Sequence, residues 1–300
     1  MTLCIAALCD GGLRAICATD GMLSDLVSGA SGDVGATKAM WFGDWLFLFA
    51  GHLSNSDLIM EEIRLQDLKD KNTLSRAGIQ STLRNAYKKH LAKWSADRFL
   101  SQYYPTIEEF RRKGRFELGD ERFAELSRAM ENDAQQNYDE QIIAVGWGKT
   151  VHAAAIYRMD RFGLSSHNLD GFTAIGAGGT SAVSTLLTSG YSRHRSFEAA
   201  LYMVCSAAFN AEGRDGVGPL TFLAVAHRRD EKDHKDKPPG RIIYPEEIAE
   251  LKKVWEKFGR PKIPGAAFRT TDEIARRIGA ATTGNLVRAV KSGLRKEKRG

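Results

Sequence analysis

Short apolar runs bounded by glycine or charged residues recur along the chain and predict buried β-strands. The first run, at residues 2–8, turns through residues 10–12 into a second run that ends at Asp20. A hairpin is expected next, with its turn at Gly43 and Asp44. The runs predicted as further strands lie at residues 37–42, 45–50, 141–148, 151–158, 172–179 and 220–226, and a turn is predicted at residues 159–163.

Between these runs, apolar residues recur at steps of three and four, which is the spacing of one face of an α-helix. A helix is expected directly after Gly51. The clearest apolar stripe consists of Ile79, Leu83, Ala86, Tyr87, Leu91 and Trp94. Thr106 and Ser196 are suited to cap further helices. These additional helices are predicted at residues 106–113, 120–133, 180–190 and 196–212.

The elements follow one another as strands, a helix pair, strands, a second helix pair and a closing strand. Two sheets, each covered by one helix pair, would make an α+β protein with a four-layer αββα sandwich. We place this domain at residues 1–227, with a helical insert at about residues 70–138. A charged, proline-ended linker at residues 228–240 leads to a C-terminal extension at residues 241–300.

The composition, with 43% hydrophobic and 27% charged residues, is typical of a soluble globular protein. No apolar run is long enough to cross a bilayer, and no signal peptide is evident, so we expect a cytoplasmic protein without membrane contacts. The cysteines have neither C-x-x-C spacing nor a histidine at ligand spacing. We therefore predict no zinc site and interpret Cys4, Cys9, Cys17 and Cys205 as small apolar residues that fill the core. The candidate chemistry described below needs no metal or organic cofactor.

Positive charge is concentrated in the C-terminal part of the chain. The formal net charge is +6 for the whole sequence, but +9 for residues 228–300 and −3 for residues 1–227. Short helices are expected at residues 245–258 and 271–278, followed by a basic tail. This tail could attract nucleic acid, but it lacks interleaved aromatic residues, so a solvated tail is the favoured interpretation and nucleic-acid binding is disfavoured.

The candidate chemistry begins at the second residue. If Met1 is removed, Thr2 carries a free α-amine that can act as the base for its own hydroxyl, so no separate histidine is needed. Lys38, paired with Asp20, could supply positive charge that helps to activate the hydroxyl.

Thr2, Asp20 and Lys38, together with the sequence Ala-Ile-Gly-Ala-Gly at residues 174–178, resemble the proteasome β-subunit family and its bacterial relatives, the N-terminal nucleophile hydrolases. The resemblance covers roughly residues 2–227. It implies that Thr2 is the nucleophile, that Asp20 and Lys38 are its charge partners, and that the Gly51 N–H holds an oxyanion. It also implies a threonine peptidase or amidohydrolase with a polypeptide or amide substrate, a homo-oligomeric ring and an ATP-dependent unfoldase partner.

The chain departs from that family at two supporting positions. Ala177 and Gly218 stand where the family has serines, although Asp215 is present, and His52 follows the candidate oxyanion glycine. We name Asp215 and His52 as supporting residues. The departures keep open two alternatives, a catalytically silent scaffold or ring protein and a binding module that acts through the basic extension. The glycines at residues 176–179 lack the Lys-Ser/Thr pair of a phosphate-binding P-loop.

Overall fold

The computed structural model describes residues 2–24, 31–33, 38–70, 74–100, 102–148, 153–228 and 240–259. The chain divides into two compact units, Met1–Lys253 and Val254–Gly300. In the second unit the described residues are 254–259, which include a turn of π-helix at Trp255–Gly259. The sheets and the candidate site belong to the first unit.

One sheet, called here the β1 sheet, has the antiparallel strand order β10-β1-β2-β11-β12. Its strands are β1 (Cys4–Cys9), β2 (Arg14–Asp20), β10 (Phe172–Ile175), β11 (Leu220–His227) and β12 (Gly240–Ile242). Cys4 in β1 lies opposite Thr19 in β2 and Ile175 in β10. This register brings the residues just before β1 to the end of β2, where Asp20 lies.

The second sheet, called here the β6 sheet, has the antiparallel order β5-β6-β7-β8-β9. Its strands are β5 (Ala39–Phe42), β6 (Trp45–Ala50), β7 (Gln141–Gly146), β8 (Ala155–Asp160) and β9 (Gly163–Ser166). The strands β3 (Met22–Ser24) and β4 (Ser31–Asp33) form a separate two-stranded ribbon. Residues 43 and 44 make the hairpin turn between β5 and β6, as predicted.

The two sheets meet through a shared apolar core, and β1 and β10 contact β6 and β7. Cys4, Ala6 and Leu8 of β1 belong to this core. The opposite face of β1 contacts helices, so the strand is buried on both faces. That burial explains why β1 is apolar at every position and lacks the alternation of a half-exposed strand.

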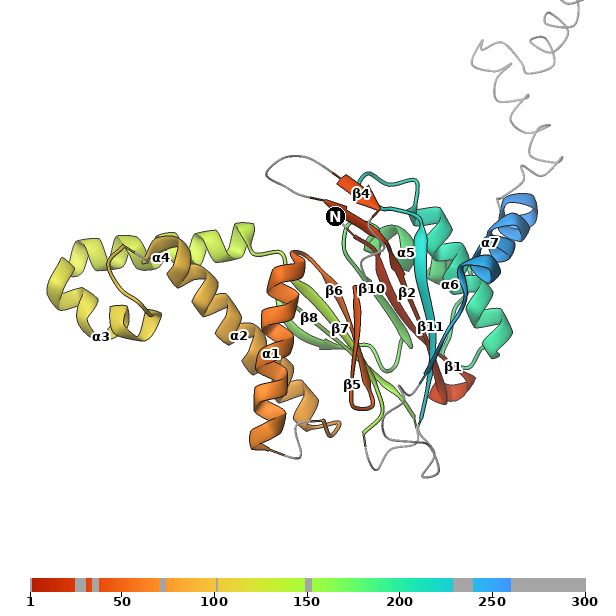
Figure 1. Cartoon of the computed structure of the whole chain (residues 1–300), viewed down its shortest axis with the longest axis horizontal. Coiled ribbons are helices and arrows are strands. Elements are labelled where there is room, and N and C mark those ends of the chain that lie inside the picture. Colours follow the sequence, from red (N-terminus) through yellow and green to blue (C-terminus); the bar gives the residue numbers. More distant parts are fainter. Residues whose placement is uncertain are drawn as a thin grey trace, which may run out of the picture. The chain divides into compact units, whose positions relative to one another are not determined.

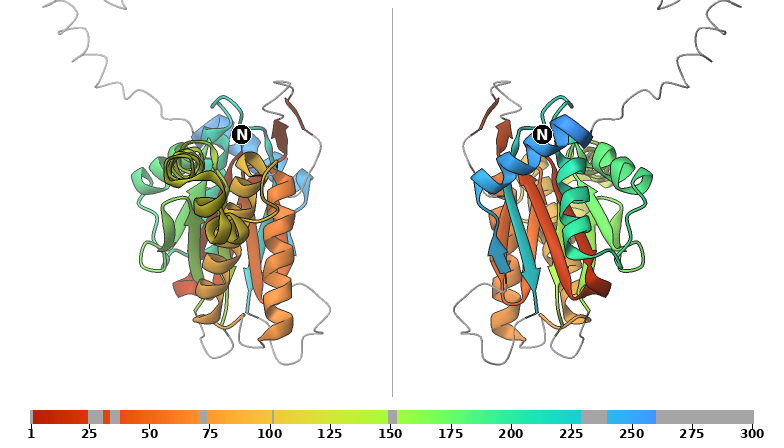
Figure 2. Two further views of the ribbon diagram at one scale, coloured as in Figure 1. Left: turned by 90° about the vertical axis from the view of Figure 1, so that its left-hand side faces the viewer. Right: turned by 90° about the vertical axis from the view of Figure 1, so that its right-hand side faces the viewer.

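Two helix pairs cover the sheets (Figure 1). Helices α1 (Leu53–Lys69) and α2 (Gly78–Phe99) pack on the β6 sheet, and α5 (Gly179–Thr188) and α6 (Phe197–Ala211) pack on the β1 sheet. Figure 2 shows α1 and α2 in front of the strands from one side and α6 in front of them from the other. The predicted α2 stripe faces the β6 sheet, where Tyr87 packs with Trp45 and Phe47.

The helical insert forms a small core of its own away from the sheets (Figure 1). Helices α3 (Ile107–Leu118) and α4 (Asp120–Asn137) pack on one another and on the end of α2. As predicted, the Thr106 hydroxyl caps α3 by accepting a hydrogen bond from the Glu109 N–H at 3.2 Å. Phe110 stacks on Phe123 with ring centroids 4.7 Å apart.

The predicted α+β class is confirmed, with differences in several elements. The strand expected from residue 151 begins at Ala155, and the turn expected at residues 159–163 is shorter because β8 runs to Asp160 and β9 starts at Gly163. β3, β4, β9 and β12, each three or four residues long, were not predicted. Helix α7 (Pro245–Val254) precedes the π-helical turn, and the helix predicted at residues 271–278 lies outside the described residues.

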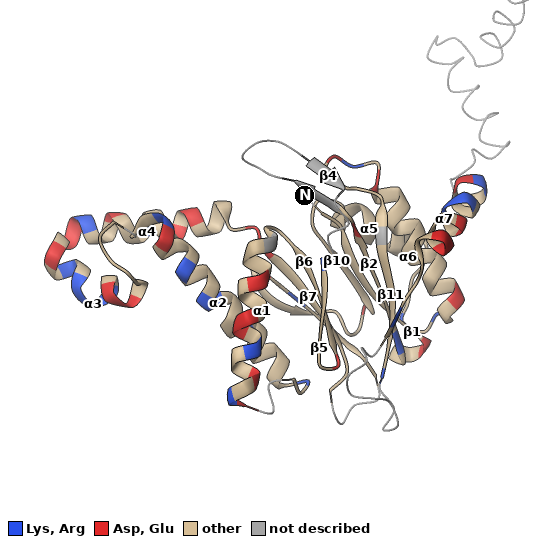
Figure 3. Ribbon diagram, viewed as in Figure 1, with Lys and Arg blue, Asp and Glu red and all other residues tan. Residues whose placement is uncertain are grey.

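Charged side chains are concentrated on the helices, while the strands are largely uncharged (Figure 3). All four cysteines are buried, as predicted, and the structure shows them unpaired. Within the described part of the chain, no helix has both the length and the apolar character needed to cross a membrane.

Candidate functional site

Asp20 and Lys38 form a buried ion pair at the edge of the two sheets. Asp20 is the last residue of β2, and Lys38 directly precedes β5. The Lys38 ammonium lies 2.8 Å from Asp20 Oδ1, and the two side chains are only 2% and 1% exposed. Because little water can screen it, this pair interacts more strongly than one on the surface.

Asp20 also accepts two backbone hydrogen bonds. The Leu3 N–H donates to Oδ1 at 2.8 Å, and the Gly218 N–H donates to Oδ2 at 2.9 Å. Both oxygens of the carboxylate therefore have a hydrogen-bond donor. The same oxygen that binds Lys38 therefore holds the peptide group that follows Thr2.

Thr2 is held through its backbone and is 4% exposed. Its carbonyl accepts a hydrogen bond from the Gly178 N–H at 3.3 Å. Gly176, with φ +84°, passes so close to the Thr2 carbonyl that a side chain at this position would collide with it. The loop between β10 and α5 therefore requires glycine because it packs against the Thr2 backbone.

The Cys4 thiol lies next to the ion pair and is inert. Its Sγ donates to the Phe49 carbonyl at 3.2 Å, and the Phe49 N–H donates to the Lys38 carbonyl at 3.0 Å. Burial raises the pKa of Cys4, while Lys38 lowers it and Asp20 raises it. Since the thiol stays protonated, we do not regard Cys4 as a nucleophile.

Gly51 follows β6 and has φ +131°, a conformation that residues with a side chain rarely adopt. A Cβ atom at Gly51 would contact the Glu140 carboxyl group, with 2.6 Å to its carbon. Phe49, two residues earlier, is hydrogen-bonded to both Lys38 and Cys4. The structure thus places Gly51 on the strand end that adjoins the ion pair.

Glu140 is 2% exposed and binds the first turn of α1. Its Oε1 accepts hydrogen bonds from the His52 N–H at 2.9 Å and from the Asn55 side-chain amide at 2.8 Å. Burial raises the pKa of Glu140 to about 7, and although these two hydrogen bonds lower it, nearby Asp139 raises it further. The carboxyl group can therefore change its charge near neutral pH.

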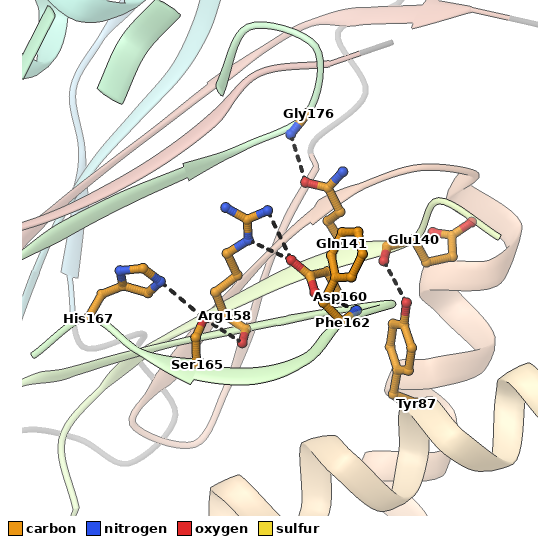
Figure 4. Close-up of polar contacts among 9 residues, drawn as sticks. All are labelled: Tyr87, Glu140, Gln141, Arg158, Asp160, Phe162, Ser165, His167 and Gly176. Atoms are coloured by element: carbon orange, nitrogen blue, oxygen red, sulfur yellow. Dashed lines mark hydrogen bonds and ion pairs between the residues drawn. The ribbon is translucent and has the colours of Figure 1, made fainter. Parts of the chain in front are cut away.

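Gln141, the next residue, reaches the loop that adjoins Thr2. Its Oε1 accepts a hydrogen bond from the Gly176 N–H at 3.2 Å. The Tyr87 hydroxyl donates to the Glu140 carbonyl at 3.0 Å. Figure 4 shows these two contacts on either side of the start of β7.

The two predicted supporting residues, His52 and Asp215, are exposed, whereas Thr2, Asp20 and Lys38 are buried. The His52 side chain is exposed, and its backbone begins α1. Asp215 is exposed and, within the residues described, makes no hydrogen bond or ion pair. The contact to Asp20 from this part of the chain comes from the Gly218 backbone.

The arrangement combines a hydroxyl residue near the N-terminus, a buried ammonium–carboxylate pair and a glycine at a strand end. Such a set can activate a hydroxyl and stabilise negative charge without a bound metal. In the described segments there is no group of three His, Cys, Asp or Glu side chains suited to hold a metal ion.

Sequence reasoning missed Glu140 and Gln141. Both are polar residues directly before an apolar strand, a position that ordinarily indicates a solvated strand end. The one available signal was their place at the end of the helical insert, where the chain returns to the sheet. Their burial depends on α1 and on the β10–α5 loop, which are distant in the sequence.

No protein-family model and no curated protein matches this chain. Among solved structures, the chain is similar to Anbu (ancestral beta-subunit) from Yersinia bercovieri, with a TM-score of 0.59 and 13% identity over 88% of this chain and 98% of that one. An Anbu mutant from Hyphomicrobium sp. strain MC1 gives a TM-score of 0.56 and 11% identity, covering 88% and 99%. A helical assembly of the Anbu complex from Pseudomonas aeruginosa gives 0.57 and 14%, covering 88% and 99%.

These similarities correct the family assignment made from the motifs. The assignment to the proteasome β-subunit family is wrong, because the structural neighbours are Anbu proteins, which are proteasome-like but distinct, and because no family model matches. The motifs misled at the family level because related folds share strand order and glycine positions. At 11–14% identity the comparisons establish the fold alone.

Proposed function

We propose that this protein is an N-terminal threonine hydrolase that cleaves amide bonds, with Thr2 as the nucleophile once Met1 has been removed. The observation that carries the proposal is the buried Asp20–Lys38 pair, whose carboxylate also holds the peptide following Thr2. A buried ion pair beside a hydroxyl residue can raise the reactivity of that hydroxyl. Packing alone gives no reason to bury two charges, because taking them out of water costs free energy.

In the proposed reaction, Thr2 Oγ attacks the substrate carbonyl carbon and its own α-amine accepts the hydroxyl proton. Lys38, held by Asp20, stabilises the developing negative charge on Oγ. The Gly51 N–H donates to the oxyanion of the tetrahedral intermediate. The amine product leaves with the proton, and water then hydrolyses the ester that joins the acyl group to Thr2.

The proposal extends to the architecture around the site. We propose that the two sheets and their helix pairs form the four-layer αββα sandwich, in which the site opens at one end between the sheets. We also propose that the chain forms a homo-oligomer and that its substrates are polypeptides or smaller amides. The helical assembly formed by the Anbu complex from Pseudomonas aeruginosa supports the oligomer.

The test is the intact mass of the purified protein before and after treatment with an electrophile that traps N-terminal threonines. We expect loss of Met1 and a single adduct in the native protein, and no adduct in Thr2→Ala. Thr82→Ala is a matched control, because Thr82 in α2 is also 4% exposed, and it should keep the adduct. Retention of Met1, or an adduct that persists in Thr2→Ala, would reject the proposal.

A catalytically silent scaffold is the second candidate. Asp20 receives a backbone N–H from Gly218, and the hydroxyl groups expected at residues 177 and 218 are absent from the sequence. A scaffold can retain Met1, so the mass measurement distinguishes the two functions. The third alternative, binding through the basic C-terminal extension, concerns residues 241–300, of which the structure describes 241–259.

A further inference from the structure

Residues 138–141, called here the α4–β7 junction, connect the helical insert to the β6 sheet and touch both backbone walls of the candidate site. On one side Glu140 contacts Gly51 and the first turn of α1. On the other side Gln141 holds Gly176, which packs against the Thr2 backbone. The proposed nucleophile and the proposed oxyanion donor are therefore joined through two consecutive residues.

The contact between Glu140 and Gly51 is close and specific. All three carboxyl atoms of Glu140 lie within 3 Å of the place where a Cβ would stand on Gly51. The carboxyl group thus occupies the space that a side chain at this position would fill. Only glycine permits this approach, and its φ of +131° is the conformation that the approach requires.

The carboxyl group is also fixed in place by its other contacts. Its Oε1 accepts the His52 N–H and the Asn55 amide, both from the start of α1. The Tyr87 hydroxyl from α2 binds the Glu140 carbonyl, so the backbone beneath the carboxyl is anchored as well. The titratable groups that interact with Glu140 are Asp139, Tyr87 and Tyr138.

We infer that Glu140 is a positioning residue: it binds the N–H of the Gly51–His52 peptide and packs against Gly51 itself, so it limits rotation at Gly51 and thereby fixes the direction of the Gly51 N–H, in the preceding peptide, toward the oxyanion. This inference rests on the proposed function, because it assigns Glu140 a role in the same reaction. The physical reason is that glycine has the freest backbone of any residue, so an oxyanion donor on glycine needs an external constraint to be preorganised. The Glu140 carboxyl group supplies that constraint by occupying the space that a side chain on Gly51 would fill.

The experiment compares Glu140→Ala, Glu140→Gln and Glu140→Asp with the native protein. The probe is trileucine boronic acid, whose tetrahedral adduct with a threonine hydroxyl places an oxygen where the oxyanion forms. Periodate oxidation is measured in parallel, because it cleaves any free N-terminal threonine whether or not the site is catalytic. Glu62→Ala is the control, since Glu62 in α1 is also partly buried but pairs with Lys89 on the outside of the helix.

We expect Glu140→Ala to weaken boronate binding by about 10- to 100-fold with unchanged periodate sensitivity, because the oxyanion donor loses its orientation. Glu140→Gln keeps the length and the acceptor oxygen and should recover binding to within about threefold. Glu140→Asp keeps the charge but withdraws the carboxyl from Gly51, so it should weaken binding by about tenfold. Glu62→Ala should bind as the native protein does.

The outcomes separate this inference from the proposed function. Native protein that resists periodate has no free N-terminal threonine, which overturns the proposed function and the inference with it. Native protein that reacts with periodate and binds the boronate, while Glu140→Ala or Glu140→Asp binds it equally well, overturns the inference alone. If Glu140→Ala does not fold, the contrast between Glu140→Asp and Glu140→Gln decides the question.

Discussion

At the scale of single residues, Asp20 is the point on which the contacts of the candidate site converge. It binds the Lys38 ammonium, the Leu3 N–H and the Gly218 N–H, and these come from three separate segments of the chain. These contacts satisfy the hydrogen-bonding capacity of a carboxylate that is buried away from water. The pair therefore serves the stability of the fold as well as the proposed chemistry.

Removing the ammonium tests this dual role. Lys38→Met should lower the free energy of unfolding by about 3 kcal/mol, because it leaves a buried carboxylate without its cation. Adding Asp20→Asn to Lys38→Met should recover part of that loss, since the remaining side chain is neutral. Urea unfolding monitored by tryptophan fluorescence measures both changes.

The control for this prediction is an exposed ion pair. Lys113 and Glu109 in α3 lie 2.6 Å apart with side chains 45% and 26% exposed, so Lys113→Met should cost less than about 1 kcal/mol. Equal losses for Lys38→Met and Lys113→Met would mean that burial of the Asp20–Lys38 pair has no energetic consequence.

At the scale of elements, the helical insert is a separate packing unit attached through α2 and α4. Phe110 and Phe123 stack between α3 and α4, and Leu126 and Met130 complete this small core with the end of α2. Its residues belong to a different cluster from those that fill the space between the sheets. Because the insert core has no residue in common with the core between the sheets, we expect the insert to be able to lose structure while the sheets stay folded.

Phe110→Ala tests the independence of the insert. Removing a buried aromatic side chain should cost about 3–5 kcal/mol, and the loss should fall on α3 and α4. In hydrogen–deuterium exchange we expect faster exchange at residues 107–137 and unchanged protection in β1 and β2. Equal loss of protection in the strands would show that the insert and the sheets unfold together.

At the scale of the whole molecule, the buried carboxyl of Glu140 links folding stability to pH. Burial raises its pKa from 4.5 to about 7 in the folded protein, so the folded state holds this proton more tightly than the unfolded chain. The stabilisation from the bound proton is fully present below the unfolded value and is lost as the pH rises through about 7.

Because the folded state binds the Glu140 proton more tightly than the unfolded chain does, the native protein should become less stable as the pH rises. Between pH 5, just above the unfolded value of 4.5, and pH 8, about one unit above the folded value, the native protein should lose roughly 2–3 kcal/mol of unfolding free energy relative to Glu140→Gln, which cannot titrate there. Urea unfolding of both proteins at the two pH values gives the difference. Parallel pH profiles for the two proteins would contradict a raised pKa at Glu140.

The sequence by itself determined most of the long elements and the α+β class, because the apolar spacing of a strand or helix is a local property of the chain. It also indicated Thr2, Asp20 and Lys38 as a group, although the family to which they were assigned was wrong. Short strands such as β9 (Gly-Leu-Ser-Ser) and β12 (Gly-Arg-Ile) were not predicted, because they lack the apolar run that marks β10, a strand of four residues that was predicted.

Only the tertiary structure decided which groups meet. The register of β1 on β2 brings Leu3 to Asp20, and the packing of the sheets brings Lys38 to the same carboxylate. The burial of Glu140 against Gly51 likewise joins residues 89 positions apart in the sequence. Such contacts depend on how whole sheets and helices pack. The local pattern of apolar residues shows which face of an element is buried, but it does not show which other element covers that face.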